Sequence, residues 1–200
     1  MKIWIEWWGM VLMSLSEKKR QILLDLAQQS IQSGMETGNP LSIDLRDYPF
    51  ELSKQRATFV TLEKNKQLRG CMGMLNAILP LAEDVCENAF SAAYKDPRFP
   101  PLEYSELEDI DISLSILSPS EEIEFTSEQD LISQIQPHID GLILENGERS
   151  GTFLPSVWKS IPTSEQFLQH LKQKAGLAKT YWSDQIKIYR YTTEIISKNT

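Results

Sequence analysis

The chain has 200 residues, with 20 Lys and Arg against 28 Asp and Glu, which gives a net charge of −8 at pH 7. This length suits one domain, or one domain with a small appended lobe. A hydrophobic share of 41% and a charged share of 24% exclude a disordered or fibrous protein. The negative charge repels phosphate backbones, so nucleic-acid binding is not expected, although Lys172, Lys174 and Lys179 form either a local basic patch or a solvated helix face.

The cysteines and histidines are too few and too scattered for a recognisable metal site. Cys71 and Cys86 form neither a disulfide framework nor a metal-ligand spacing, which favours a reducing, cytoplasmic location. His138 and His170 are too far apart for a His-x-x-x-His site. A metal shared among distant residues stays open, and no cofactor is indicated.

Residues 1–12 are apolar and rich in Trp, but they are too short to span a bilayer, which needs about 20 apolar residues. They also lack the pattern of a secretory signal. A natural helix start follows at Met13 to Glu17. We therefore interpret residues 1–12 as an N-terminal extension, either an upstream start-site artefact or a tail that touches a membrane or partner, and we expect it to be dispensable for folding.

The first half of the remaining chain alternates between helical and strand patterns. Apolar residues at spacings of three and four predict a helix over residues 16–32, with Gly34 as its stop. An irregular connection follows over residues 34–53, and a hairpin is predicted about the polar residues 64–66, with Cys71 near the end of its second strand. Pro80 opens a helix that carries Cys86 on its apolar face, and the prolines of residues 95–101 end it.

The second half contains short elements joined mainly by hairpins. Alternating residues predict a strand over residues 110–116, and a capped helix is predicted over residues 127–135. The Asn146-Gly147 pair predicts a hairpin within residues 141–154. A capping box at residues 163–166 opens a helix that ends at Gly176, and residues 186–196 are predicted to form one strand. Hairpin connections favour an α+β fold with an antiparallel sheet and packed helices.

The most unusual segment is Arg69-Gly70-Cys71-Met72-Gly73, in which glycines flank a cysteine. Residues two apart on a strand share a face, so Arg69 is expected beside Cys71, where its charge favours the nucleophilic thiolate. Gly70 and Gly73 permit close approach of a ligand or of another backbone. The alternative is architectural: glycines mark a bulge or tight packing, and free cysteines are often buried. Cys86, in contrast, is expected to be a core residue.

Two further segments hold candidate binding residues. The prolines of residues 96–101 form a stiff loop that fixes Asp96 and Arg98, either as part of a cleft or as a helix exit held by one salt bridge. Thr152, which follows the second hairpin turn, either faces a cleft or ends a core strand.

Taken in order, these segments resemble the AMMECR domain family, whose prokaryotic members are called AmmeMemoRadiSam system protein A. The likeness is carried by Leu68 to Gly73 and by Asp96 to Pro101, and it continues to about Ile196, so we assign residues 13–197 to an AMMECR-like domain. Met72 stands where the family usually has Ile, and Met74 where it usually has a small polar residue. The resemblance implies an α+β fold with a larger antiparallel-sheet part and a smaller lobe.

The family name implies a pathway shared with Memo-like and radical SAM proteins, which are therefore the expected partners, but it supplies no reaction and no substrate. Two functions remain open. One is an enzyme, or enzyme subunit, that uses a cleft cysteine, with Cys71 as nucleophile or redox thiol and Arg69 orienting an anionic substrate group. The other is a non-catalytic protein-binding or adaptor module.

Overall fold

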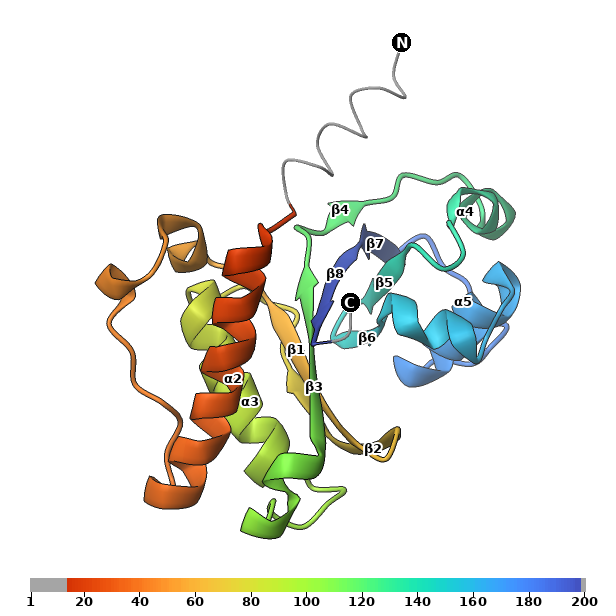
Figure 1. Cartoon of the computed structure of the whole chain (residues 1–200). Helices are drawn as coiled ribbons and strands as arrows, with labels where there is room; N and C mark the ends of the chain where they lie inside the picture. Colours follow the sequence, from red (N-terminus) through yellow and green to blue (C-terminus); the bar gives the residue numbers. More distant parts are fainter. Residues whose placement is uncertain (1–13, 199–200) are drawn as a thin grey trace. The chain divides into compact units, whose positions relative to one another are not determined.

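A computed structural model describes residues 14–198 and divides the chain into two compact units (Figure 1). The first unit contains the chain up to Ile116 together with the segment from Glu194 onward, and the second is Leu117–Thr193. Each unit has a four-stranded sheet and its own helices, so the predicted α+β class with antiparallel strands is confirmed. The extension predicted at residues 1–12 lies outside the described residues.

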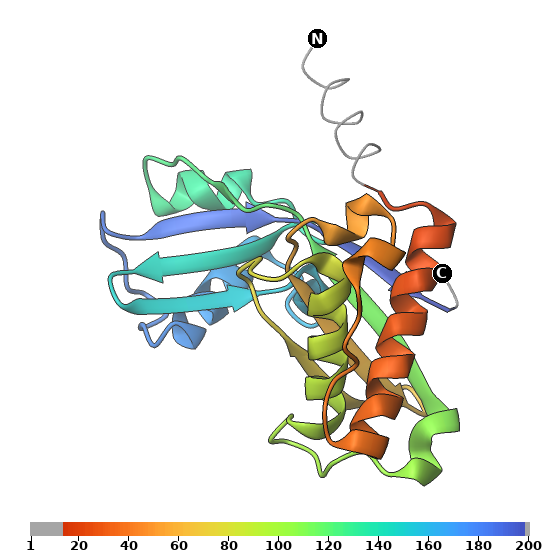
Figure 2. The ribbon, with the colours of Figure 1, turned by 90° about the vertical axis from the view of Figure 1, so that its left-hand side faces the viewer.

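The first unit packs two helices side by side against one face of its sheet (Figures 1 and 2). The helices are α2 (Glu17–Thr37) and α3 (Leu81–Tyr94). The sheet has the order β2-β1-β3-β8, with bounds β1 Thr58–Lys64, β2 Gln67–Gly73, β3 Ile110–Leu117 and β8 Thr193–Ser197. Alternate residues of β1 and β3 enter the core, as the strand period requires, so the outer face carries Phe59, Thr61, Ser113 and Ser115.

The first helix is longer than predicted, and Gly34 does not end it. Gly34 lies inside α2, where a Cβ atom would stand 2.4 Å from the Tyr94 ring and 2.6 Å from the Phe90 ring of α3. The glycine therefore allows the two helices to approach closely. The helix ends instead at Gly38, which adopts the left-handed conformation with φ 73°.

Short helical turns occupy parts of the connection predicted as irregular over residues 34–53 and also precede β3. They are η1 (Leu45–Asp47), η2 (Phe50–Ser53) and η3 (Tyr104–Asp109), and all three belong to the first unit. The hairpin of β1 and β2 turns through Asn65 and Lys66, both with positive φ, so its position is confirmed.

The second unit has the sheet order β4-β7-β5-β6, with β4 Glu121–Glu122, β5 Gly141–Asn146, β6 Arg149–Phe153 and β7 Lys187–Tyr191. Its helices are α4 (Glu128–Gln134), η4 (Pro155–Lys159) and α5 (Ser164–Lys174). The core is aromatic: Trp158 stacks on Phe167 with 3.8 Å between ring centroids. The predicted helix starts are confirmed, since Ser127 caps α4 and Thr163 caps α5.

Two predictions in this part of the chain are wrong. Residues 186–196 are not one strand, because β7 joins the second sheet and β8 joins the first. The strand is interrupted at Thr192. The Thr192 N–H donates to Ser118 Oγ, and the Thr192 carbonyl accepts from the Ser118 N–H. Lys172 is not on a solvated helix face either: it is fully buried, and its Nζ donates to Glu128 Oε1 at 2.5 Å.

Across residues 14–198, no helix is both long and apolar enough to cross a membrane.

Candidate functional site

The segment around Cys71 forms the edge strand β2, and a bulge interrupts its pairing with β1. Leu62 pairs with Gly70 and Glu63 pairs with Leu68, which leaves Arg69 as the extra residue. A bulge breaks the alternation of faces, so strand spacing alone does not place Arg69 beside Cys71 as the sequence suggested.

Gly70 and Gly73 are required by close backbone contacts. A Cβ atom on Gly70 would lie 2.1 Å from the carbonyl oxygen of Ala92 in α3, and one on Gly73 would lie 2.3 Å from the carbonyl oxygen of Thr58. Of the two interpretations drawn from the sequence, approach by a ligand or by another backbone, the geometry favours the backbone at both positions.

The loop after α3 completes the free edge of β2. The Cys71 N–H donates to Asp96 Oδ2 at 2.9 Å, and Arg98 Nη2 donates to the Cys71 carbonyl at 3.4 Å. Asp96 is buried, and its carboxylate also accepts from Arg98 Nη2 at 2.6 Å. The Arg98 guanidinium holds the pKa of Asp96 well below its usual range. The ion pair therefore takes the place of a neighbouring strand.

Arg69 is engaged by a carboxylate that the sequence analysis did not single out. Its Nη2 and Nε atoms donate to the two Glu106 oxygens at 2.8 and 3.0 Å, and its Nη1 donates to the Pro100 carbonyl at 3.0 Å. This pairing, chiefly the hydrogen bond from Arg69, lowers the pKa of Glu106 to about 2. Glu106 also forms a capping box with Glu103, and that spacing of three between acids was the available signal.

The Cys71 thiol is half-buried, and its recorded partner is Thr61 on the neighbouring strand, whose Oγ1 donates to Sγ at 3.4 Å. The second cysteine, Cys86, is buried in the core of the first unit, as predicted. Burial raises the pKa of the Cys86 thiol to about 12.

Another buried acid, Asp84 in the first turn of α3, was also missed. It is 1% exposed, and its Oδ2 accepts from Thr58 Oγ1 at 2.6 Å and from Asn88 Nδ2 at 2.8 Å. Within the described part of the chain, Oδ1 has no partner. Burial raises the pKa of Asp84 to about 6. The only signal in the sequence was an acid set among apolar helix positions.

The remaining candidate, Thr152, belongs to the second unit, as do the two histidines, His138 and His170. Thr152 Oγ1 donates to the Leu142 carbonyl at 2.9 Å and lies 3.1 Å from the Tyr191 hydroxyl, which burial makes a weak acid with a pKa of about 12. His170 Nδ1 contacts the Gln166 carbonyl of its own helix at 2.8 Å. No group of three or more His, Cys, Asp or Glu side chains suited to a metal ion occurs among residues 14–198.

Comparison with known proteins gives concordant results. The AMMECR1 family model matches residues 24–196. A protein of Methanothermobacter thermautotrophicus is 36% identical over 191 residues, covering 92% of this chain and 97% of its own, and protein MJ0810 of Methanocaldococcus jannaschii is 38% identical over 164 residues, covering 78% and 80%. The crystal structure of the uncharacterized protein PH0010 from Pyrococcus horikoshii has a TM-score of 0.83 and 34% identity, covering 90% and 92%. The chain belongs to the AMMECR1 family.

Proposed function

We propose that this protein is a non-catalytic protein-binding or adaptor module. In it, the segment around Cys71 forms a sheet edge that is braced by the ion pairs of Arg69 and Arg98. The observation that carries this proposal is that both arginines of the motif are paired. Arg69 lies 2.8 Å from Glu106, and Arg98 lies 2.6 Å from Asp96. In each pair the carboxylate offsets the positive charge that a substrate anion would otherwise meet. These arginines thus serve the rigidity of the edge.

Exposed apolar side chains at both ends of β2 supply contact area for a partner. Leu68 and Met74 are each 44% exposed, on either side of the braced strand. The core of a protein interface is more apolar than its rim, and Met is among the residue types enriched there. The family resemblance suggests the partner class, a Memo-like or radical SAM protein of a shared pathway, and a cytoplasmic location belongs to the same proposal.

A binding experiment tests this proposal directly. The full chain is titrated calorimetrically with the purified Memo-like and radical SAM proteins of the same organism. We expect the double variant Leu68→Ser, Met74→Ser to bind about tenfold more weakly. Ile139→Ser, which changes an apolar side chain of the second unit that is 50% exposed, is the matched control and leaves binding unchanged. Cys71→Ser also keeps full binding. Absence of binding to both proteins contradicts the proposal.

An enzyme or enzyme subunit is the second candidate, and the half-buried thiol beside the Thr61 hydroxyl favours it. In this alternative Cys71 is the nucleophile or redox thiol, Arg69 orients an anionic group, and Asp96 and Arg98 contribute to binding. The rate of Cys71 alkylation is measured against pH in the native protein, in Arg69→Met, in Arg98→Met and in the double variant. Unchanged profiles would leave the thiolate without electrostatic activation.

A further inference from the structure

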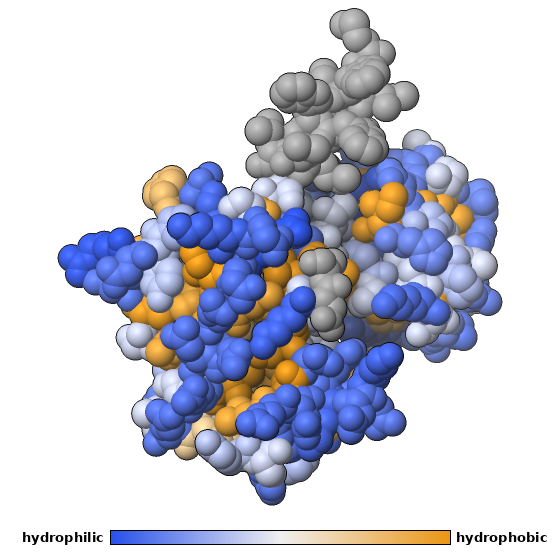
Figure 3. All heavy atoms as spheres, viewed as in Figure 1, coloured by the Kyte–Doolittle hydropathy of each residue, from blue (hydrophilic) through white to orange (hydrophobic). Residues whose placement is uncertain are grey.

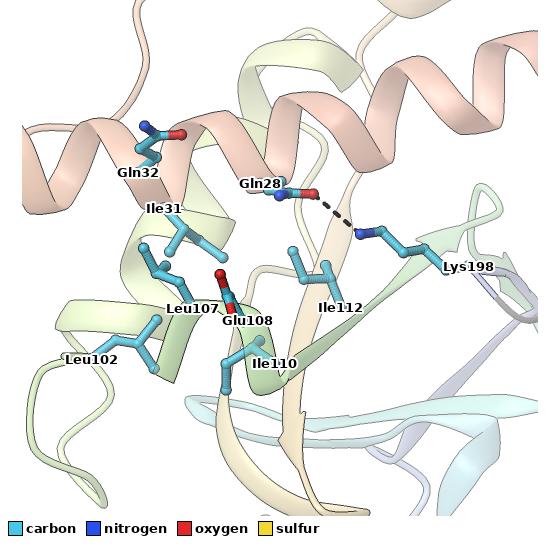
Figure 4. Close-up of a pocket in the computed structure, with 9 residues that line it drawn as sticks. All are labelled: Gln28, Ile31, Gln32, Leu102, Leu107, Glu108, Ile110, Ile112 and Lys198. Atoms are coloured by element: carbon cyan, nitrogen blue, oxygen red, sulfur yellow. Dashed lines mark hydrogen bonds between the residues drawn. The ribbon is translucent and has the colours of Figure 1, made fainter. Parts of the chain in front are cut away.

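The first unit contains a pocket of about 290 Å³ between α2, η3, the start of β3 and Lys198 (Figure 4). Its floor consists of the buried side chains Ile31, Leu102 and Ile112, and the half-buried Leu107 and Ile110 form its apolar walls. Apolar side chains of this unit remain visible among polar ones on the side that α2 faces (Figure 3). The pocket is therefore lined by apolar surface that a ligand would remove from water.

One part of the rim offers hydrogen-bond donors. Lys198 Nζ donates to Gln28 Oε1 at 3.2 Å, as Figure 4 shows. An ammonium has three donors and no acceptor, so the Gln28 oxygen must face Lys198 and its NH₂ group points elsewhere. The remaining Lys198 donors and the Gln28 NH₂ group are together complementary to a carboxylate.

Another part of the rim offers acceptors. Gln32 Nε2 donates to Glu36 Oε1 at 3.0 Å, which leaves the Gln32 oxygen available. Glu108 is exposed, and within the described residues no hydrogen bond or ion pair engages its carboxylate, which is directed toward the α2 side chains in Figure 4. A carboxylate and a carboxamide oxygen together suit an ammonium group.

The wall that carries Glu108 is held in place by the family motif. Glu106, two residues earlier in η3, pairs with both Arg69 and Lys64 and forms the capping box with Glu103. Ligand sites are specific when their side chains sit on supported elements. The ion pair of Arg69 and Glu106 thus supports the element that carries Glu108.

We propose that this pocket binds a free amino acid with an apolar side chain. The ammonium group lies at Glu108 and Gln32, the carboxylate lies at Lys198 and Gln28, and the side chain packs against the apolar walls. The volume is at the small end of the range for ligand pockets, roughly 300 to 1,000 Å³, which suits a ligand of this size. Opposite charges on one rim distinguish a zwitterion from a simple amine or fatty acid.

Calorimetric titration of the full chain with L-leucine tests the assignment, and three analogues each remove one feature. N-acetyl-L-leucine lacks the ammonium, L-leucinamide lacks the carboxylate, and glycine lacks the apolar side chain. We expect saturable binding of L-leucine and at least about tenfold weaker binding of every analogue. No saturable binding of L-leucine overturns the proposal, and so does equal binding of any analogue.

Variants locate the bound molecule. Glu108→Gln and Lys198→Met should each weaken L-leucine binding by about tenfold or more, and Leu107→Trp should abolish it by filling the pocket. Glu148→Gln and Lys159→Met alter exposed charges of the second unit and serve as matched controls. Circular dichroism checks that each variant is folded. Unchanged binding in Glu108→Gln and Lys198→Met would overturn this site, whatever the result for protein partners.

Discussion

The two ends of α3 each place an aspartate in the interior, but the pKa values of the two carboxyl groups move in opposite directions. Asp84, in the first turn, accepts hydrogen bonds through one oxygen only, and burial raises its pKa to about 6. Asp96, just beyond the last turn, bonds through both oxygens, and the Arg98 guanidinium holds its pKa far below the usual range. Burial alone therefore does not decide the charge state: the partners do.

The C-terminal end of α3 meets β2 and is held by the ion pair of Asp96 and Arg98, so we call it the braced end. At the N-terminal end, the buried charge of Asp84 opposes folding. Substitutions at the braced end should remove favourable contacts. Substitution of Asp84 should instead remove an unfavourable one.

The largest effect is expected for Gly70→Ala at the braced end. Its Cβ atom would lie 2.1 Å from the Ala92 carbonyl, so β2 and α3 must separate. We expect the free energy of unfolding to fall by about 3 kcal/mol, measured by urea denaturation. Gly38→Ala is the matched control: its φ is 73° but its surroundings are open, so it should cost only about 1 kcal/mol. An equal decrease in the free energy of unfolding in the two variants would contradict the steric explanation.

The substitution Asp84→Asn tests the N-terminal end of α3 through the pH dependence of the free energy of unfolding. Because the folded pKa is raised from 3.8 to about 6, the native state binds more protons than the unfolded state between these values. The contribution of Asp84 to the free energy of unfolding is therefore largest below pH 4, decreases as the pH rises, and is constant above pH 6. The decline amounts to between about 2 and 3 kcal/mol.

The measurement compares unfolding free energies of wild type and Asp84→Asn from pH 4 to 7. The difference between the two proteins should change across this range in favour of the variant. A constant difference would show that Asp84 does not titrate in this window.

Asp96→Asn should cost about 2 kcal/mol at pH 7, because the charged hydrogen bonds to Arg98 are lost while the Cys71 N–H can keep an acceptor. The lowered pKa means that this stabilisation is present above about pH 4 and is lost on acidification. The chain supplies a matched control in Asp44, which pairs with Arg46 at the same spacing on the surface. Asp44→Asn should have no measurable effect. Similar losses in both variants would mean that burial of Asp96 does not matter.

The smallest effect concerns the two cysteines. Cys86→Ala should lower stability by about 1 kcal/mol because Cys86 is 1% exposed in the core, whereas Cys71→Ser should change stability little. In the native protein a thiol reagent should label Cys71 and spare Cys86, whose pKa is about 12. Equal labelling rates would contradict the position of α3.

Periodicity predicted most of the fold, because the apolar pattern that defines α3 and β3 is the pattern that the core enforces. It failed where a distant contact decides the outcome. Glycine commonly ends a helix, so Gly34 was predicted to end α2, but it lies inside the helix and packs against the rings of Phe90 and Tyr94. Residues 186–196 read as one strand because period alone does not reveal that their two halves join different sheets.

Only part of the candidate site was predicted, because some of its contacts join residues that are far apart in the sequence. The sequence singled out Arg69, Cys71, Asp96 and Arg98, and the salt bridge between Asp96 and Arg98 was among the alternatives considered. A bulge near the glycines was also among the alternatives, but its position at Arg69 was not predicted. Glu106 was not foreseen, since the ion pair spans 37 residues. Thr152 remains a candidate within the second unit.

The membership of β8 in the first sheet has a consequence for the order in which the protein is made. Ile196 belongs to the core of the first unit, and Glu194 accepts a hydrogen bond from the Leu15 N–H, 179 residues earlier. The second unit is thus an insertion between two parts of the first. During translation the inserted unit emerges whole before the last strand of its host has left the ribosome. The earlier-starting unit is therefore the later one to be completed, and until then the flank of β3 that receives β8 is an open sheet edge that can pair with another chain.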